Sequence, residues 1–108
     1  MNFNHTNHIN LIGQISNEPY IVEKKNGISA SFCVRTSETY LDDKGKTIRK
    51  SDWHQVKAYG RLARMVKELA YKSQPLAVEG KMESSFFTTK RGEKRRISHV
   101  VANDLILR

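Results

Sequence analysis

Apolar and polar residues alternate regularly in one stretch of the chain, which predicts a half-buried β-strand there. Between residues 28 and 35 every second side chain is apolar: Ile28, Ala30, Phe32 and Val34. A period of two is the repeat of a strand with one face toward a core. Lys25-Asn26-Gly27 comes just before it and is typical of a hairpin turn. A first strand over residues 7–15, bending near Gly13 and continued by residues 20–22, should precede that turn.

The same alternation returns between Asp52 and Tyr59, where it separates two kinds of side chain. One face is mainly aliphatic and holds Val56 and Ala58 together with His54, which we interpret as a hydrogen-bonded structural histidine. The other face holds aromatic, polar and basic ones, namely Trp53, Gln55, Lys57 and Tyr59. Because successive side chains of a strand point to opposite faces, we expect Trp53 and Tyr59 to be exposed together.

The hydrophobic period changes to that of a helix at residues 61–72. One apolar stripe is formed by Leu62, Met65, Val66, Leu69 and Ala70. Pro75 prevents the helix from continuing. Strands follow at about residues 76–88 and 95–103, with a short final segment over residues 105–107. Phe86 and Phe87 are adjacent, so we expect one to lie in the core and the other outside.

The predicted order of three strands, a helix and two strands makes the fold all-β with one helix. Short connections indicate a closed sheet. A five-stranded Greek-key barrel with its helix between strands three and four is the oligonucleotide/oligosaccharide-binding (OB) fold. A five-stranded barrel of another topology is the alternative. With 108 residues the chain predicts one domain, residues 7–108, after a short N-terminal extension at 1–6.

Positive charge is concentrated in the second part of the chain. The net charge is +8; residues 44–108 hold sixteen basic and six acidic residues, whereas residues 1–43 hold three and five. Two basic segments, 44–50 and 90–96, contain Gly and are predicted to be loops between strands. Such a balance favours an anionic partner such as nucleic acid or an acidic membrane surface, and a merely soluble basic protein is the alternative.

Several classes of function have no support in the residues. The chain contains no Gly-rich phosphate loop and a single cysteine, Cys33, and its four histidines are scattered. We therefore expect neither catalysis nor a metal nor a cofactor. No apolar run approaches the roughly 20 residues of a membrane span, and the N-terminus does not resemble a secretory signal. The expected location is the cytoplasm, without membrane attachment.

The residues fit the binding of single-stranded nucleic acid, which needs exposed aromatic rings for the bases and cations for the phosphates. Trp53 and Tyr59 qualify because they share a polar face. Tyr40 precedes the first basic segment, and Phe86-Phe87 precedes the second. An RNA-binding OB domain is an alternative, since the 2′-hydroxyl is the group that distinguishes RNA from DNA.

Several segments resemble the bacterial single-stranded DNA-binding protein family. The opening of the chain does so with matching spacing, through Asn7-His-Ile-Asn-Leu-Ile-Gly13, Pro19 and Asn26-Gly27. The likeness continues in Thr36-Ser-Glu38, Asp52-Trp-His-Gln-Val56, Tyr59-Gly-Arg-Leu-Ala63 and Val78-Glu-Gly80. The likeness covers residues 7–108. It implies an OB fold that wraps single-stranded DNA around a homo-oligomer without sequence preference, in replication, recombination or repair.

The resemblance also assigns roles to single residues. Family stacking positions fall on Tyr40, Trp53, Tyr59 and Phe87. The family is basic where this chain has Gln55 and Glu83-Ser-Ser85, so some phosphate contacts should move to other cations. The expected phosphate-binding side chains are Arg35, Lys44, Lys46, Arg49, Lys50, Lys57, Arg61, Lys72, Lys81, Lys90, Arg91, Lys94, Arg95 and Arg96.

Positions that match the family's subunit contacts are His8, His54, Ala77 and Glu79. His8, Pro75 and Ala77 depart from the family's residues, so a dimer is an alternative to a tetramer. Family members that serve the replisome continue into an acidic tail, and this sequence ends at Arg108 without one. A tail-less relative of primosomal replication protein N, with replication-restart partners, is therefore the alternative function. A plasmid- or phage-borne protein also fits.

Overall fold

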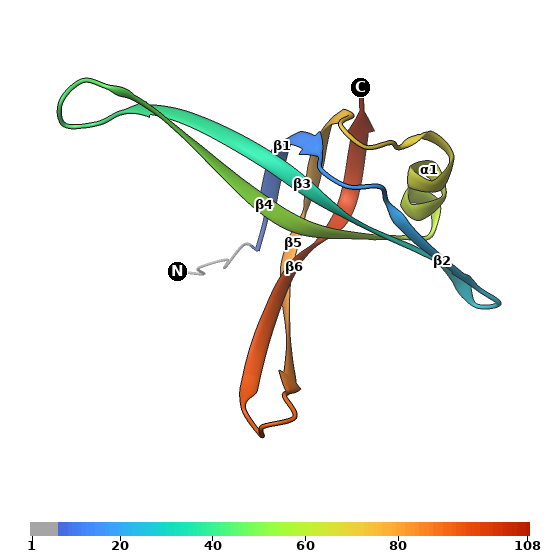
Figure 1. Cartoon of the computed structure of the whole chain (residues 1–108). Coiled ribbons are helices and arrows are strands. Elements are labelled where there is room, and N and C mark those ends of the chain that lie inside the picture. The colour runs from blue at the N-terminus through green and yellow to red at the C-terminus, as the bar shows by residue number, and fades with distance from the viewer. Residues whose placement is uncertain (1–6) are drawn as a thin grey trace, which may run out of the picture.

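The computed structural model describes residues 7–108 and consists of six strands and one helix (Figure 1). The order of elements agrees with the predicted one. In chain order they are β1 (Ile9–Ile15), β2 (Tyr20–Lys24), β3 (Gly27–Leu41), β4 (Thr47–Tyr59), α1 (Arg61–Leu69), β5 (Pro75–Thr88) and β6 (Lys94–Leu107).

The strands close into a barrel. The sheet order is β1-β5-β6-β4-β3-β2, and β1 pairs with β3 as well, which joins the ends of the sheet. β2 pairs with residues 27–31 of β3, whereas β1 pairs with Arg35 and Val34 of that strand. β1 and β2 thus act as two parts of one barrel strand. The predicted five-stranded OB barrel is confirmed, including the turn at Lys25-Asn26.

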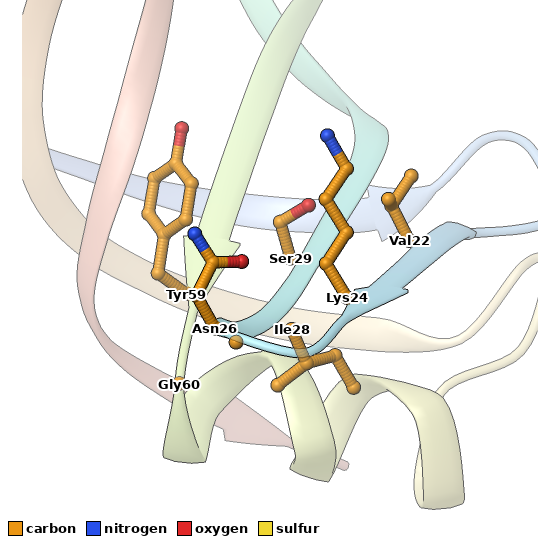
Figure 2. A pocket seen from close by; sticks show the side chains of 8 residues that line it. Val22, Lys24, Asn26, Ile28, Ser29, Tyr59 and Gly60 are labelled. Carbon is orange, nitrogen blue, oxygen red and sulfur yellow. The ribbon is translucent and has the colours of Figure 1, made fainter.

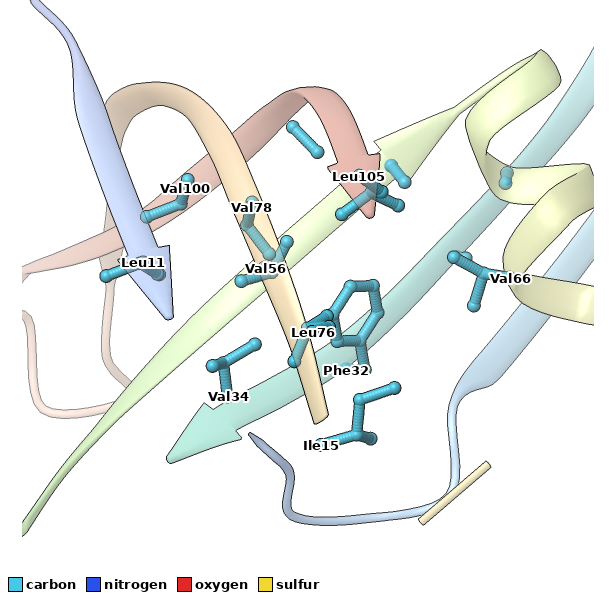
Figure 3. Packing of buried hydrophobic residues seen from close by; sticks show 14 of the residues in the cluster. Leu11, Ile15, Phe32, Val34, Val56, Val66, Leu76, Val78, Val100 and Leu105 are labelled. Carbon is cyan, nitrogen blue, oxygen red and sulfur yellow. The ribbon is translucent and has the colours of Figure 1, made fainter. Parts of the chain in front are cut away.

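The core fills the barrel with the side chains that the alternation placed inside. Phe32 lies at its centre, completely buried, and Val34 and Val56 from β3 and β4 pack beside it (Figure 3). Helix α1 adds Ala63 and Val66 to the same cluster.

Helix α1 is shorter than predicted, because it ends at Leu69 rather than at residue 72. Ala70 is already extended, and the Ser73 amide donates to the Ile15 carbonyl at 2.7 Å. This bond holds the chain against β1 and leaves no room for another turn. Leu69, expected on the apolar stripe, is consequently exposed.

Gly13, near which the first strand was expected to bend, lies where two strands approach closely. A Cβ atom on Gly13 would lie 2.1 Å from the Arg35 carbonyl oxygen. Gly80, beside the bulge in β5, is equally close to the carbonyl oxygen of Val101. Both sites need glycine because another backbone occupies the space of a side chain.

Two hairpins extend beyond the barrel as two-stranded ribbons (Figure 1). We call residues 36–52 the β3–β4 arm and residues 83–99 the β5–β6 arm. Pairing continues to Leu41–Thr47 in the first and to Thr88–Lys94 in the second. The two basic segments are therefore not loops throughout, because Thr47–Lys50 and Lys94–Arg96 belong to strands. Residues 105–107 likewise continue β6 without a break.

Both phenylalanines of the β5–β6 arm are exposed, so the prediction that one of them lies in the core is wrong. Phe86 is 72% exposed and Phe87 45%. Alternation still points them to opposite faces. However, Met82 and Val100 are the last inward residues of this hairpin that contact the core, and beyond them neither face has a core to cover.

Candidate nucleic-acid interface

Two hollows lie along the outer face of β3, and we call this face the groove. Its floor is made of small side chains, because Ser29, Ser31 and Cys33 occupy the outward positions of β3. Tyr20 and Lys57 are the partners of Ser31 on either side. Since directly paired residues share a face, one side of this groove is β2 and the other is β4.

The groove deepens beside Tyr59 into a hollow of about 400 Å³ (Figure 2). The side chains of Lys24 and Tyr59 stand on opposite sides of Ser29 there, and Asn26 lies at the turn between them. Tyr59 is 52% exposed. The hollow therefore presents an aromatic ring and an ammonium group above a floor that does not fill it.

Trp53 continues the same face of β4 and is 61% exposed, as predicted. It lies directly opposite Arg35, whose Nη2 donates a hydrogen bond of 3.2 Å to Gln14 Oε1. Arg35 and Trp53 line a second hollow, of about 280 Å³, with Ser16 and Ser73. A cation is thus held beside the largest exposed aromatic ring.

The outer surface extends from the groove onto the rest of the barrel. Lys57 pairs with Val101 of β6, and Val101 pairs with Lys81 of β5. Lys57 and Lys81 therefore flank Val101 in one outward row. Lys81 Nζ lies 3.5 Å from Glu83 Oε2, so part of its charge is compensated within the protein.

Tyr40 does not share a face with Trp53. It pairs with Ile48, five positions along the ribbon from the Arg35–Trp53 pair, and an odd number of steps changes the face. The Tyr40 face of the β3–β4 arm carries Glu38, Lys50 and Asp52. The Trp53 face carries only cations as charged residues, Arg35 and Arg49.

The remaining candidate cations are exposed but scattered. Lys44 and Lys46 lie at one hairpin tip, where both amides donate to Asp42 Oδ1, and Lys90 and Arg91 lie at the other. Arg61 begins α1 next to Gly60, which lines the hollow at Tyr59. Lys72 lies in the loop after α1 and lines neither hollow of the groove.

Sequence reasoning missed Tyr20 and Lys24, which form the β2 side of the groove. Both are exposed. The signal was present, since Tyr20, Val22 and Lys24 alternate with inward residues and the Asn-Gly turn sets their register. What was missing was the pairing that puts β2 and β4 on either side of the small β3 side chains.

An ion pair attaches β2 to the helix. Lys67 Nζ lies 2.6 Å from Glu23 Oε1, and this hydrogen bond and its charge hold the pKa of the Glu23 carboxyl below its usual value. Glu23 occupies an inward position of β2, one residue from Lys24. The pair therefore helps to position the β2 side of the groove.

The expected subunit-contact residues fall into two places. On the outer face of β1 and β5, His8 Nδ1 lies 3.9 Å from Glu79 Oε1, and Ala77 pairs with Ile12, which is 80% exposed. His54 lies apart from them on β4, where its Nε2 is 3.2 Å from the Thr36 hydroxyl.

Within residues 7–108, no three His, Cys, Asp or Glu side chains are placed to hold a metal ion. The single helix of this region is too short and too polar to cross a membrane. The arrangement offers exposed aromatic rings, hydroxyl-lined hollows and cations. These groups suit an extended polyanion that carries planar aromatic groups.

Known proteins share this fold and about a third of the residues of this sequence. Single-stranded DNA-binding protein 1 of Chlorobaculum tepidum is 30% identical over 101 residues, 92% of this chain and 62% of that protein. The protein of the same name from Xylella fastidiosa (strain 9a5c) is 33% identical over 101 residues, covering 92% and 74%. The chain thus spans less than two thirds of the Chlorobaculum protein.

The structure of a Plasmodium falciparum SSB complex with ssDNA superimposes with a TM-score of 0.89 at 25% identity, covering 99% of this chain and 98% of that one. The family model described as the single-strand binding protein family matches residues 6–107. That match includes the barrel, the groove and both arms. The chain belongs to the single-strand binding protein family.

Proposed function

We propose that this protein binds single-stranded DNA without sequence preference and so coats or protects it during replication, recombination or repair in the bacterial cytoplasm. One observation carries the proposal: Trp53 and Tyr59 are exposed on one face of β4, beside a groove with a floor of small side chains. Unstacked bases need such rings, whereas the bases of a duplex are already stacked on one another.

In this mechanism the aromatic rings bind the bases by stacking, and the cations neutralise the phosphates. Each stacked base contributes about 1–3 kcal/mol and is accepted whatever its identity, because every base has a π-face. Arg35, Lys57 and Lys24 lie beside the rings and neutralise phosphates. Affinity should therefore fall with salt, by roughly 0.7 log units per log unit of salt for each phosphate contacted.

The arms lengthen the binding path. Tyr40 and Phe87 add stacking contacts beyond the barrel. These contacts are weaker because carboxylates lie among the cations around each ring and repel the phosphates of the strand. The basic hairpin tips add phosphate contacts that depend on salt: Lys44, Lys46, Arg49, Lys50, Lys90, Arg91, Lys94, Arg95 and Arg96. Arg61, Lys72 and Lys81 extend the positive surface around the barrel.

The functional unit is a homo-oligomer, a dimer or a tetramer, in which more than one groove serves one strand. The outer face of β1 and β5 supports this because Ile12, Ala77 and Ile106 form an apolar row there, beside His8 and Glu79. Burial of such a row would stabilise an interface by about 25 cal/mol per Å² of apolar surface.

Fluorescence of Trp53 tests the proposal, because it is the sole tryptophan of the chain. The protein would be titrated with an oligothymidylate, an oligouridylate and a DNA duplex of equal length. Strong quenching by the single DNA strand alone is the expected result. Equal responses to strand and duplex would mean generic phosphate binding and would overturn it. A preference for the RNA strand would favour an RNA-binding domain instead.

A further inference from the structure

The two faces of the β5–β6 arm differ in charge. Strand pairing places Phe87 opposite Arg95 on one face and Phe86 opposite Arg96 on the other. Thr88 and Lys94, also directly paired, share the Phe86 face, as do Ser84 and Ser98. Each face thus holds one aromatic ring beside an arginine.

On the Phe87 face the cations have carboxylate partners. Arg95 Nη2 lies 3.1 Å from Glu93 Oε2, and Lys81, at the base of the arm, lies 3.5 Å from Glu83. A phosphate that approaches this face must compete with Glu83 and Glu93, both of which repel it. Exposed ion pairs are weak, but they cancel charge where the ligand would bind.

On the Phe86 face the cations have no such partner. Among residues 7–108, no carboxylate lies within 4.0 Å of Lys94 or Arg96. The other polar groups of this face are hydroxyls, with Ser84 Oγ and Ser98 Oγ 3.1 Å apart. The Phe86 face therefore carries two uncompensated positive charges.

The Phe86 ring is also the more accessible of the two, at 72% exposed against 45%. It lines an open hollow of about 330 Å³ with Phe87, Thr88 and Lys94. This hollow places a ring and an ammonium group within reach of one ligand. A second copy that paired through this same face would bring the same cations to it and be repelled, whereas a polyanion is attracted.

We propose that the Phe86 face, with Lys94 and Arg96, is the main nucleic-acid-binding face of the β5–β6 arm. A base stacks on Phe86 and the adjoining phosphates contact Lys94 and Arg96. The Phe87 face is secondary. This inference rests on the proposed function, because it assigns where single-stranded DNA leaves the barrel.

Matched variants on the two faces test it, with binding of a labelled oligothymidylate followed by fluorescence anisotropy. We expect Phe86→Ala to weaken binding roughly five- to hundred-fold, the equivalent of one stacked base, and Phe87→Ala to weaken it less. Arg96→Gln should reduce the salt slope by about 0.7, and Arg95→Gln by less. Thermal denaturation checks that all four variants are folded.

Three results would overturn the inference. They are a loss in Phe87→Ala equal to or larger than that in Phe86→Ala, an unchanged salt slope in Arg96→Gln, and a change of oligomeric mass in Phe86→Ala, which would mean that another subunit covers the ring. Failure of the proposed function looks different, since the unsubstituted protein would then not prefer the single strand over a duplex.

Discussion

Arg35 and Trp53 face each other directly across β3 and β4, and Gln14 of β1 accepts a hydrogen bond from the arginine. Three strands thus meet at the exposed indole. The guanidinium is thereby held beside the indole, and the proposed function predicts that stacking and charge neutralisation act on the same nucleotide.

Trp53→Ala should weaken binding of an oligothymidylate roughly five- to hundred-fold, because one stacked base is lost. The salt slope should stay as it is, since no cation is removed. Anisotropy titrations at several salt concentrations measure both. Tyr71→Ala is the matched control, because Tyr71 is similarly exposed but lies in the loop after α1. Equal losses in the two variants would contradict a stacking role for Trp53.

Lys24→Gln should lower the salt slope by about 0.7, because Lys24 lines the hollow at Tyr59 and is expected to neutralise one phosphate there. Lys25→Gln removes the same charge from the next residue, which does not line that hollow. A smaller effect is expected for it. Identical salt slopes in the two variants would show that the β2 side of the groove makes no specific contact.

Tyr40→Ala should weaken binding less than Trp53→Ala. Tyr40 lies on the face of the β3–β4 arm that carries Glu38 and Asp52, which repel phosphates. Replacing Glu38 by Gln should strengthen binding at low salt for the same reason, and the effect should fade as salt screens it. A Tyr40→Ala loss as large as that of Trp53→Ala would refute this ranking.

Gly13→Ala should destabilise the barrel by about 1–3 kcal/mol, the usual cost of forcing atoms into a packed site. The new Cβ would lie 2.1 Å from the Arg35 carbonyl oxygen, so β1 and β3 must separate. Urea denaturation measures the loss. Asn10→Ala, at an exposed position of the same strand, should change stability little. A Gly13→Ala protein of unchanged stability would rule out the close approach.

The Glu23–Lys67 pair should contribute stability that depends on pH. The pKa of Glu23 is lowered in the folded protein, so the contribution is present in full above the unfolded pKa of about 4.5 and is lost as the pH falls through the lowered value. The difference in Tm between the unsubstituted protein and Glu23→Gln should therefore shrink from pH 7 toward pH 3. A difference that is constant with pH would indicate that the ion pair adds nothing.

Much of the fold could be predicted because hydrophobic alternation is a local property of a strand. Ile28, Ala30, Phe32 and Val34 are all buried, and Trp53 and Tyr59 are exposed together, as the period of two required. The helix and its place between strands followed from the change of period. Gly13 was singled out for an equally local reason, its position inside a strand, although only a bend was expected there.

Other features depend on groups that lie far apart in the chain. Phe86 and Phe87 are both exposed because the β5–β6 hairpin extends beyond the end of the barrel, which no local sequence pattern shows. Helix α1 stops at Leu69 because the loop after it bonds to β1, some sixty residues earlier in the chain.

The order of residues is enough to predict which side chains alternate and how much positive charge the chain carries. Which cations keep that charge free for a ligand depends on the folded arrangement of the strands. Arg95 and Arg96 are neighbours of one residue type, yet strand pairing turns them to opposite faces, and only Arg95 meets a carboxylate. The reason is physical: a charge acts through distances in space, and these depend on the register of the strands.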